Sequence, residues 1–415
     1  MRVANPHIRE PQRLQSVIAF EVPEDALPAT HPARVLWTVL GGFDLSAFSA
    51  EVTSVAGDAG RPQLSPRMML TLWCFAISEG VGSARKIARL IRRDTAYRWI
   101  VGDLTVSHDK LSKFRREHGA AFDTLFTDVV ATLLHKGLLS LDLVTQDGTR
   151  TRAAASAPSF RSFGSLLHCR EQAALHLKAV LADDHHEHTK AERARREAAA
   201  RDYQARVEAA IDTVKALQAE RGPKAAATAR ASTTDADARV MKMGDGGFRP
   251  ALNVQYAVAG SGEGGPRAIV GVRVTNVGSD MGSLTPMIEQ IEARTGEKPT
   301  TLLADGGYAK HDDIVQATRH EVMVLVPPSD RAKSIEALRQ EGAPPEVIAW
   351  RERMETPEAK EQYRARASLC ELANAHQKTH HGIQQLLVRG IPKATCVILM
   401  GAITMNLLQF AARLA

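Results

Sequence analysis

The chain has 415 residues, which exceeds one ordinary domain and predicts two or three, each able to bury a core. Apolar residues make up 44% of it, which excludes a disordered protein, and aromatic residues only 5%, which argues against a surface built mainly on base stacking. The formal net charge of +6 fits a nucleic-acid partner without requiring one.

Residues 1–135 are predicted to form an all-α N-terminal domain. Pro66 is well placed to begin a helix that is apolar on most sides through Phe75. Three short helices should follow: a basic one after Ser83, one near residues 96–100, and a second basic one after Ser107. This arrangement is similar to a helix-turn-helix.

Positive charge is concentrated in these short helices. Ten lysines and arginines between Gly80 and His118 stand against four acids. We therefore predict DNA contacts here, and the alternative is a solvated basic face on an ordinary bundle. The candidate DNA-binding residues are Arg85, Lys86, Arg89, Lys110, Lys113, Arg115 and Arg116.

From residue 136 the pattern changes to that of a mixed α/β domain over 136–415. Residues 138–147 alternate and predict a strand that ends at Asp147. A helical insertion is expected over 155–235, with nearly balanced charges and a solvated face. His185, His186 and His188 inside it are interpreted as a polar turn, because no fourth zinc ligand is evident.

The remaining elements complete an RNase H-like order. Strands are expected over 249–258, 269–275, 301–305 and 321–326, and Asp280 is expected to cap a helix after the second of these. Helices are expected over 312–318 and 357–388. The uncharged stretch 394–412 contains Asn406 and Gln409 and is interpreted as a buried helix rather than a membrane span.

Three acids form the candidate catalytic constellation. Asp147 and Asp305 each follow a predicted strand and precede a glycine, and Glu371 lies in the last of these helices. Three converging carboxylates repel one another unless cations lie between them, and Mg²⁺ prefers such oxygen ligands. Two ions roughly 3.5–4 Å apart can assist both the attacking and the leaving oxygen of a phosphodiester.

The helix around Glu371 adds a second pattern. Arg364, Glu371 and Lys378 are spaced by seven residues and would share one face of a continuous helix. A basic, acidic, basic stripe of this kind could hold a DNA backbone over the metal site, and the alternative is a solvated face with weak ion pairs.

These motifs resemble the insertion-sequence transposases of the DDE group, in the branch with an InsH-like N-terminal domain. The matching stretches include 60–70, 82–87, 113–116, Asp147-Gly-Thr, Leu252-Asn-Val-Gln, Ala304-Asp-Gly-Gly-Tyr and the segment 356–378. The resemblance implies that Asp147, Asp305 and Glu371 are the metal-binding triad. Tyr363, Arg366 and Lys378 are similar to the Tyr-x2-Arg…Glu-x6-Lys signature near the transposon end, but four residues separate Arg366 from Glu371 where the signature usually has three.

The sequence thus predicts a DNA transposase that cuts at terminal inverted repeats and joins the 3′-hydroxyl ends to target DNA, using Mg²⁺ or, as a substitute, Mn²⁺. The alternatives are an RNase H-like structure-specific nuclease and a non-catalytic DNA-binding regulator derived from a transposase. We expect double-stranded DNA as partner, a homodimer or higher assembly on it, and no membrane. A cytoplasmic location is expected because the four cysteines form no CxxC pair and the N-terminus shows no signal peptide.

Overall fold

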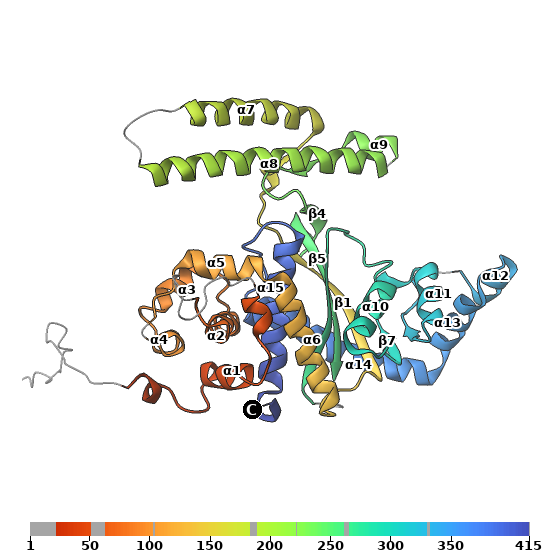
Figure 1. The fold of residues 1–415 in the computed structure, drawn as a ribbon. Helices are drawn as coiled ribbons and strands as arrows, with labels where there is room; N and C mark the ends of the chain where they lie inside the picture. Colours follow the sequence, from red (N-terminus) through yellow and green to blue (C-terminus); the bar gives the residue numbers. More distant parts are fainter. Residues whose placement is uncertain are drawn as a thin grey trace, which may run out of the picture.

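The computed structural model describes residues 22–50, 63–102, 104–182, 189–220, 222–260, 265–329 and 333–414, without the side chains of Glu371 and Leu372. The predicted histidine turn and parts of the Gly60 and Gly260 loops lie outside these residues. The N-terminal part is helical throughout its described length (Figure 1). Its helices are α1 (Pro32–Leu40), α2 (Pro66–Ser78), α3 (Ala84–Leu90), α4 (Thr95–Val101), α5 (His108–Glu117) and α6 (Gly119–His135).

Local sequence explains where these helices begin. Ser83, Asp94 and Ser107 each precede a helix and accept a hydrogen bond from a backbone amide of its first turn. Pro66 occupies the start of α2, whose residues from Met68 to Ile77 are all buried. The three predicted short helices are therefore present as α3, α4 and α5.

A central mixed sheet follows the helical part. It contains β1 (Leu143–Arg152), β4 (Arg239–Lys242), β5 (Phe248–Gly260), β6 (Arg267–Thr275), β7 (Thr301–Leu303) and β8 (Met323–Leu325). Strand β1 pairs antiparallel with β5 and parallel with β7, and β7 pairs parallel with β8. Both β4 and β6 pair antiparallel with β5.

Helices connect or cover the strands. Between β6 and β8 lie α10 (Leu284–Thr295) and α11 (His311–Arg319). The chain then forms α12 (Ile335–Gln340), α13 (Pro345–Glu355), α14 (Pro357–Ala375) and a π-helical turn at His376–His380. The last long helix is α15 (Ile391–Gln409), followed by α16 (Ala411–Leu414).

One hydrophobic core joins the N-terminal helices to the sheet. It contains residues of α2 and α6, residues of β5 and β6, and most of α15. Asn406 of α15 exchanges hydrogen bonds with the backbone of Ile269 in β6, which fixes the helix against the sheet. Within the described residues, α15 is also the helix long and apolar enough to cross a membrane, but two thirds of its apolar window (67%) is buried in this core.

The helical insertion is a separate hairpin that projects from the body (Figure 1). It consists of α7 (Phe163–Ala182), α8 (Lys190–Glu220) and α9 (Pro223–Ala227), between the short paired strands β2 (Phe160–Arg161) and β3 (Ala231–Ser232). It has its own small core, which includes Leu166, Val207 and Ile211. All of it lies inside the predicted interval 155–235.

Several predicted boundaries were wrong. Strand β1 begins at Leu143 and not at residue 138, and β7 ends at Leu303 and not at Asp305. Strand β1 does not end at Asp147 but continues to Arg152, because Thr149 and Thr151 remain paired with Val254 and Leu252 of β5. The helix expected over 357–388 ends as an α-helix at Ala375, where the π-helical turn begins. This change of helical pitch separates Lys378 from the face predicted for it.

Candidate active site

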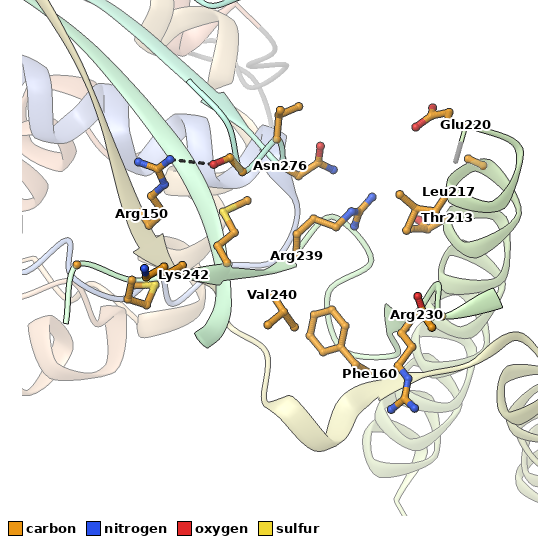
Figure 2. Close-up of a pocket in the computed structure, with 17 residues that line it drawn as sticks. Arg150, Phe160, Thr213, Leu217, Glu220, Arg230, Arg239, Val240, Lys242 and Asn276 are labelled. Carbon is orange, nitrogen blue, oxygen red and sulfur yellow. Dashed lines mark hydrogen bonds between the residues drawn. The ribbon is translucent and has the colours of Figure 1, made fainter. Parts of the chain in front are cut away.

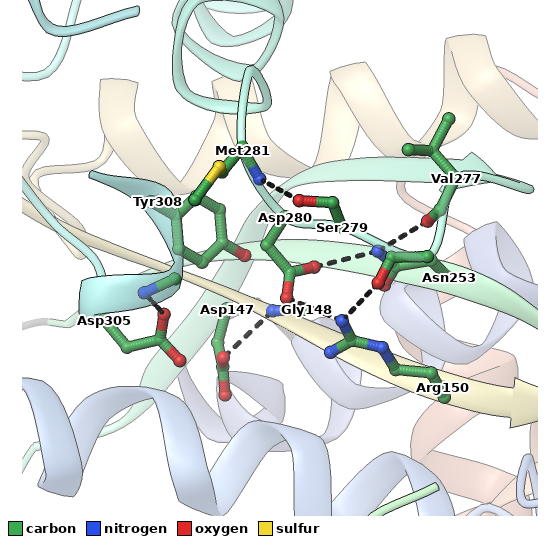
Figure 3. Close-up of polar contacts among 12 residues, drawn as sticks. Asp147, Gly148, Arg150, Asn253, Val277, Ser279, Asp280, Met281, Asp305 and Tyr308 are labelled. Carbon is green, nitrogen blue, oxygen red and sulfur yellow. Dashed lines mark hydrogen bonds and ion pairs between the residues drawn. The ribbon is translucent and has the colours of Figure 1, made fainter. Parts of the chain in front are cut away.

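Asp147 and Asp305 meet at the edge of the sheet where the parallel pairing stops. The pairing of β1 with β7 ends at Thr145 and Leu303, so Asp147 and Asp305 each follow it by two residues. Figure 3 shows both carboxylates on the same side of β1. The prediction that these two acids converge is supported by this geometry, although Asp147 lies within its strand and not at its end.

A guanidinium from α14 lies between the two acids. The Arg366 side chain is 3.5 Å from Asp147 and 3.8 Å from Asp305, with only 16% of it exposed. Burial disfavours its charge, but Asp147, Tyr363 and Asp305 together raise the pKa of Arg366. A single positive group therefore faces two carboxylates.

Asp147 is the more enclosed of the two acids. Burial raises its pKa, and the neighbouring charge of Asp305 adds to this, while Arg366 and two hydrogen bonds oppose it. Those bonds come from the Gly148 amide, at 2.9 Å, and from the Asn374 amide group, at 2.8 Å. Asp305 instead uses one oxygen to accept a bond from Gly307 N and leaves the other toward Arg366.

One face of α14 packs on β1 through residues spaced by four. Arg366 and Asn374 contact Asp147, and Cys370 between them is fully buried beside Thr145, so that burial raises its pKa to about 12. Cys370 stands where the usual signature spacing would place glutamate. Glu371 follows it on the same helix, and its side chain is outside the described structure.

The predicted stripe of Arg364, Glu371 and Lys378 does not form one face. The Arg364 side chain is 77% exposed and pairs with Glu361, away from the acids. Lys378 lies in the π-helical turn, where burial lowers its pKa while the nearby charge of Asp147 opposes this. Tyr363 is half-buried and hydrogen-bonds Arg366. Tyr363, Arg366 and Lys378 are therefore near the acids, and Arg364 is not.

A buried polar network supports β1 from its other side (Figure 3). Asp280 accepts hydrogen bonds from Asn253 at 2.8 Å, Gln255 at 2.6 Å and Arg150 at 2.9 Å. Gly148 permits this, because a Cβ there would overlap the side chains of Asp280 and Gln255.

Tyr308 and Gln146 extend the network. The Tyr308 hydroxyl donates to Gln255, and Gln146 bridges Gln255 and the carbonyl of Ser283. The predicted role of Asp280 as a helix cap was wrong, since Asp313 accepts the bonds from the first amides of α10. An acid soon after a strand indicates a candidate functional residue, and Asp280 has this position. The sequence does not indicate which face of the sheet its side chain would join.

The predicted DNA-binding residues of the N-terminal helices divide into two groups. Six are exposed on α3 and α5, namely Arg85, Lys86, Arg89, Lys110, Lys113 and Arg116. Arg115 is 6% exposed, donates to the carbonyl of Gly82 at 2.6 Å and lies over the ring of Trp73. The prediction that Arg115 contacts DNA was therefore wrong, because its charge is used inside the helical domain.

The oxygen atoms available at this edge are suited to a hard divalent cation. Two carboxylates lie beside each other here, and the amide that bonds Asp147 belongs to Asn374, whose Oδ1 is buried without a hydrogen-bond partner. Among the described side chains no group of three or more His, Cys, Asp and Glu is placed to hold a metal ion. Glu371 is not among the side chains covered by that statement.

Two protein-family models match the chain. One is a transposase domain that matches residues 21–117, and the other is a transposase DDE domain that matches residues 332–411. Segments near both ends of the chain thus match transposase domains. They are consistent with an insertion-sequence DDE transposase, as the resemblance implied. No curated protein and no solved structure matches the chain.

The two matched transposase segments divide the candidate residues in a useful way. The first contains the exposed basic residues of α3 and α5, and the second contains Arg366, Glu371 and Lys378. Asp147 and Asp305 lie between the two segments. Their assignment therefore depends on the geometry described above and not on the family models.

Proposed function

We propose that the protein is a DNA transposase that cuts at the ends of its element and joins the resulting 3′-hydroxyls to target DNA. The observation that supports this most directly is the convergence of Asp147 and Asp305 around one positive group. The order of the strands supports it too. Strands β1, β7 and β8 are parallel neighbours, and β5 runs antiparallel to β1 and to β6, as in an RNase H-like fold, with the short β4 as a further antiparallel partner of β5.

Asp147, Asp305 and Glu371 would hold divalent cations, Mg²⁺ or Mn²⁺ as its substitute. Bound there, such ions supply Lewis-acid activation of an attacking oxygen and stabilisation of a leaving one. Asn374 holds one oxygen of Asp147, while the other accepts a bond from Gly148 N and lies toward Arg366. Arg366 and Lys378 offer positive groups beside the acids for the phosphates of a bound strand.

The chain's own residues need not form a covalent bond to DNA. Cys370, a nucleophilic side chain beside the acids, is fully buried with its thiol pKa raised to about 12, so it stays protonated near neutral pH. Water in the first step and a DNA hydroxyl in the second are the nucleophiles that fit. The exposed basic residues of α3 and α5 would bind the element's ends. The protein would act as a homodimer or a higher assembly on double-stranded DNA.

The decisive experiment is cleavage of a duplex carrying the element's own end, with Mg²⁺ present. Asp147→Asn and Asp305→Asn should each abolish cleavage and retain end binding, because they remove cation ligands but no contact to distant DNA. Glu371→Gln should do the same. The matched control is Glu361→Gln on the same helix, whose side chain is 70% exposed and paired with Arg364.

The outcomes separate the possible functions. Normal cleavage by Asp305→Asn would overturn the proposal, and normal cleavage by Glu371→Gln would remove the third acid from it. Cleavage without strand transfer into plasmid DNA would indicate a structure-specific nuclease. End binding by the wild type with no cleavage would indicate a non-catalytic regulator.

A further inference from the structure

A wide groove separates the helical hairpin from the edge of the sheet. It has a volume of about 1140 Å³ and lies between the C-terminal half of α8 and strand β4, beside the loop after β6 (Figure 2). Thr213, Leu217 and Glu220 line it from α8, and residues 239–244 line it from β4 and its end. No contact described above uses this surface except that of Arg150 with Asp280.

The charge of this groove is almost entirely positive. Its ionisable lining residues within the described chain are Arg150, Arg230, Arg239 and Lys242, with Glu220 as the one acid. By contrast, the cavity beside the start of α15 is lined by three acids, Asp202, Asp235 and Asp237, as well as by lysine and arginine side chains. Its five cations are thus offset in part by these acids, and Arg206 pairs directly with Asp202.

Arg150 connects the groove to the polar network on the face of β1 opposite the two acids. Arg150 lies three residues after Asp147 on β1, and it reaches the groove while its guanidinium bonds Asp280. Lys378 lies within electrostatic range of both Asp147 and Arg150. Positive groups therefore lie on both faces of β1, with Arg366 and Lys378 beside the acids and Arg150, Lys242 and Arg230 toward the groove.

We propose that this groove binds the sugar-phosphate backbone of the duplex DNA whose strand is cut at Asp147 and Asp305. The inference rests on the proposed function and assigns a task to the hairpin, which forms one wall. Phosphate contacts fix a duplex without reading its sequence, and a row of cations along a groove of this size suits that task. The exposed Val240, at 51%, lies in the same groove and would face the bound backbone.

Charge reversal in the full-length protein tests the proposal. Arg230 and Lys242 are both exposed, so Arg230→Glu with Lys242→Glu should leave the fold intact. Binding to a duplex of arbitrary sequence should weaken at least tenfold at 0.1 M salt. The slope of log affinity against log salt should fall by about 2, because two phosphate contacts are lost.

The matched control reverses the same charge on the outer helix. Arg170 and Lys178 are exposed on α7, which lies on the side of α8 away from the sheet (Figure 1). Arg170→Glu with Lys178→Glu changes net charge equally and should leave the salt slope unchanged. Equal losses in both double variants, or no loss in the groove variant, would overturn the proposal.

Cross-linking locates the DNA independently of affinity. In a Cys169→Ser background, Val240→Cys should form a disulfide with a thiol tethered to the backbone of a bound duplex. Leu175→Cys on α7, where Leu175 is 61% exposed, should not. Cross-linking at 175 and not at 240 would overturn the proposal.

The two proposals can fail separately. A wild type that cleaves DNA while the groove variants bind it normally would refute the groove alone. DNA binding that depends on the groove, in a chain that never cleaves, would refute the transposase activity alone.

Discussion

The guanidinium of Arg366 lies 3.5 Å from the carboxylate of Asp147 and 3.8 Å from that of Asp305. It therefore occupies the place where a cation would otherwise offset the repulsion of the two acids. A divalent ion that binds there competes with this internal positive charge. We therefore expect Arg366 to act as a counter-ion of the acids when no metal is bound, and to contact phosphates when a metal takes its place.

Replacing Arg366 should strengthen metal binding while weakening catalysis. Arg366→Gln removes the competing charge, and we expect Mn²⁺ to bind about tenfold more tightly, since a largely buried ion pair of this length is worth on the order of 1.4 kcal/mol. Titration calorimetry of the DNA-free protein measures this. Arg364→Gln, on the exposed side of the same helix, is the control and should bind Mn²⁺ like the wild type. Equal affinities in all three proteins would contradict the counter-ion role.

A methyl group at Gly148 should displace the neighbouring catalytic acid. In Gly148→Ala the new Cβ would overlap Asp280 and Gln255, and β1 must shift to accommodate it. A displacement of about 1 Å at Asp147 would lower the cleavage rate about a hundredfold, with DNA binding retained. Overpacking should also lower the free energy of unfolding by roughly 1–3 kcal/mol.

Gly164→Ala is the control for this change. Gly164 lies in α7 with no atom near the position of a Cβ, so alanine there should leave cleavage unchanged. Unchanged cleavage in Gly148→Ala would show that the network behind β1 does not position Asp147.

Much of the fold follows from local sequence patterns, and the exceptions have physical reasons. Caps at Ser83, Asp94 and Ser107 and the alternation along β5 indicate elements directly. The true end of β1 depended on pairing with β5, which lies about a hundred residues later in the chain. The cap of α10 likewise came from Asp313, 29 residues away from Leu284, while the nearer Asp280 joined a network on the sheet.

In the candidate site, too, some residues could be predicted from local sequence and others depend on distant parts of the chain. The acids Asp147 and Asp305 were predictable because each follows strand residues and precedes glycine. Asn374 was missed, although it follows Arg366 by eight residues and so lies on the same helical face. The burial of Arg115 could not be predicted either, since it depends on Trp73 and Gly82, which lie more than thirty residues earlier.

A buried histidine should make the fold sensitive to acid. His381 follows the π-helical turn and is 1% exposed, and burial together with His376 and His380 lowers its pKa to about 3. Its ring lies 3.4 Å from Gln377, and the next residue, Gly382, packs on Gly80 at the end of α2. The turn that holds Lys378 is thereby anchored to the N-terminal helices.

The sign of the effect follows from proton linkage. Below pH 6.5 the unfolded chain protonates this histidine, while the folded chain does not until about pH 3, so stability falls as the pH drops through this range. Between pH 7.5 and 5, His381 should cost about 2 kcal/mol of unfolding free energy. Chemical denaturation at the two pH values measures the difference, which should shrink by about that amount in His381→Asn. The control is His168→Asn, at an exposed position on α7, which should show the same change in unfolding free energy between the two pH values as the wild type. If His381→Asn also showed that same change, the His381 ring would not be buried in its neutral form.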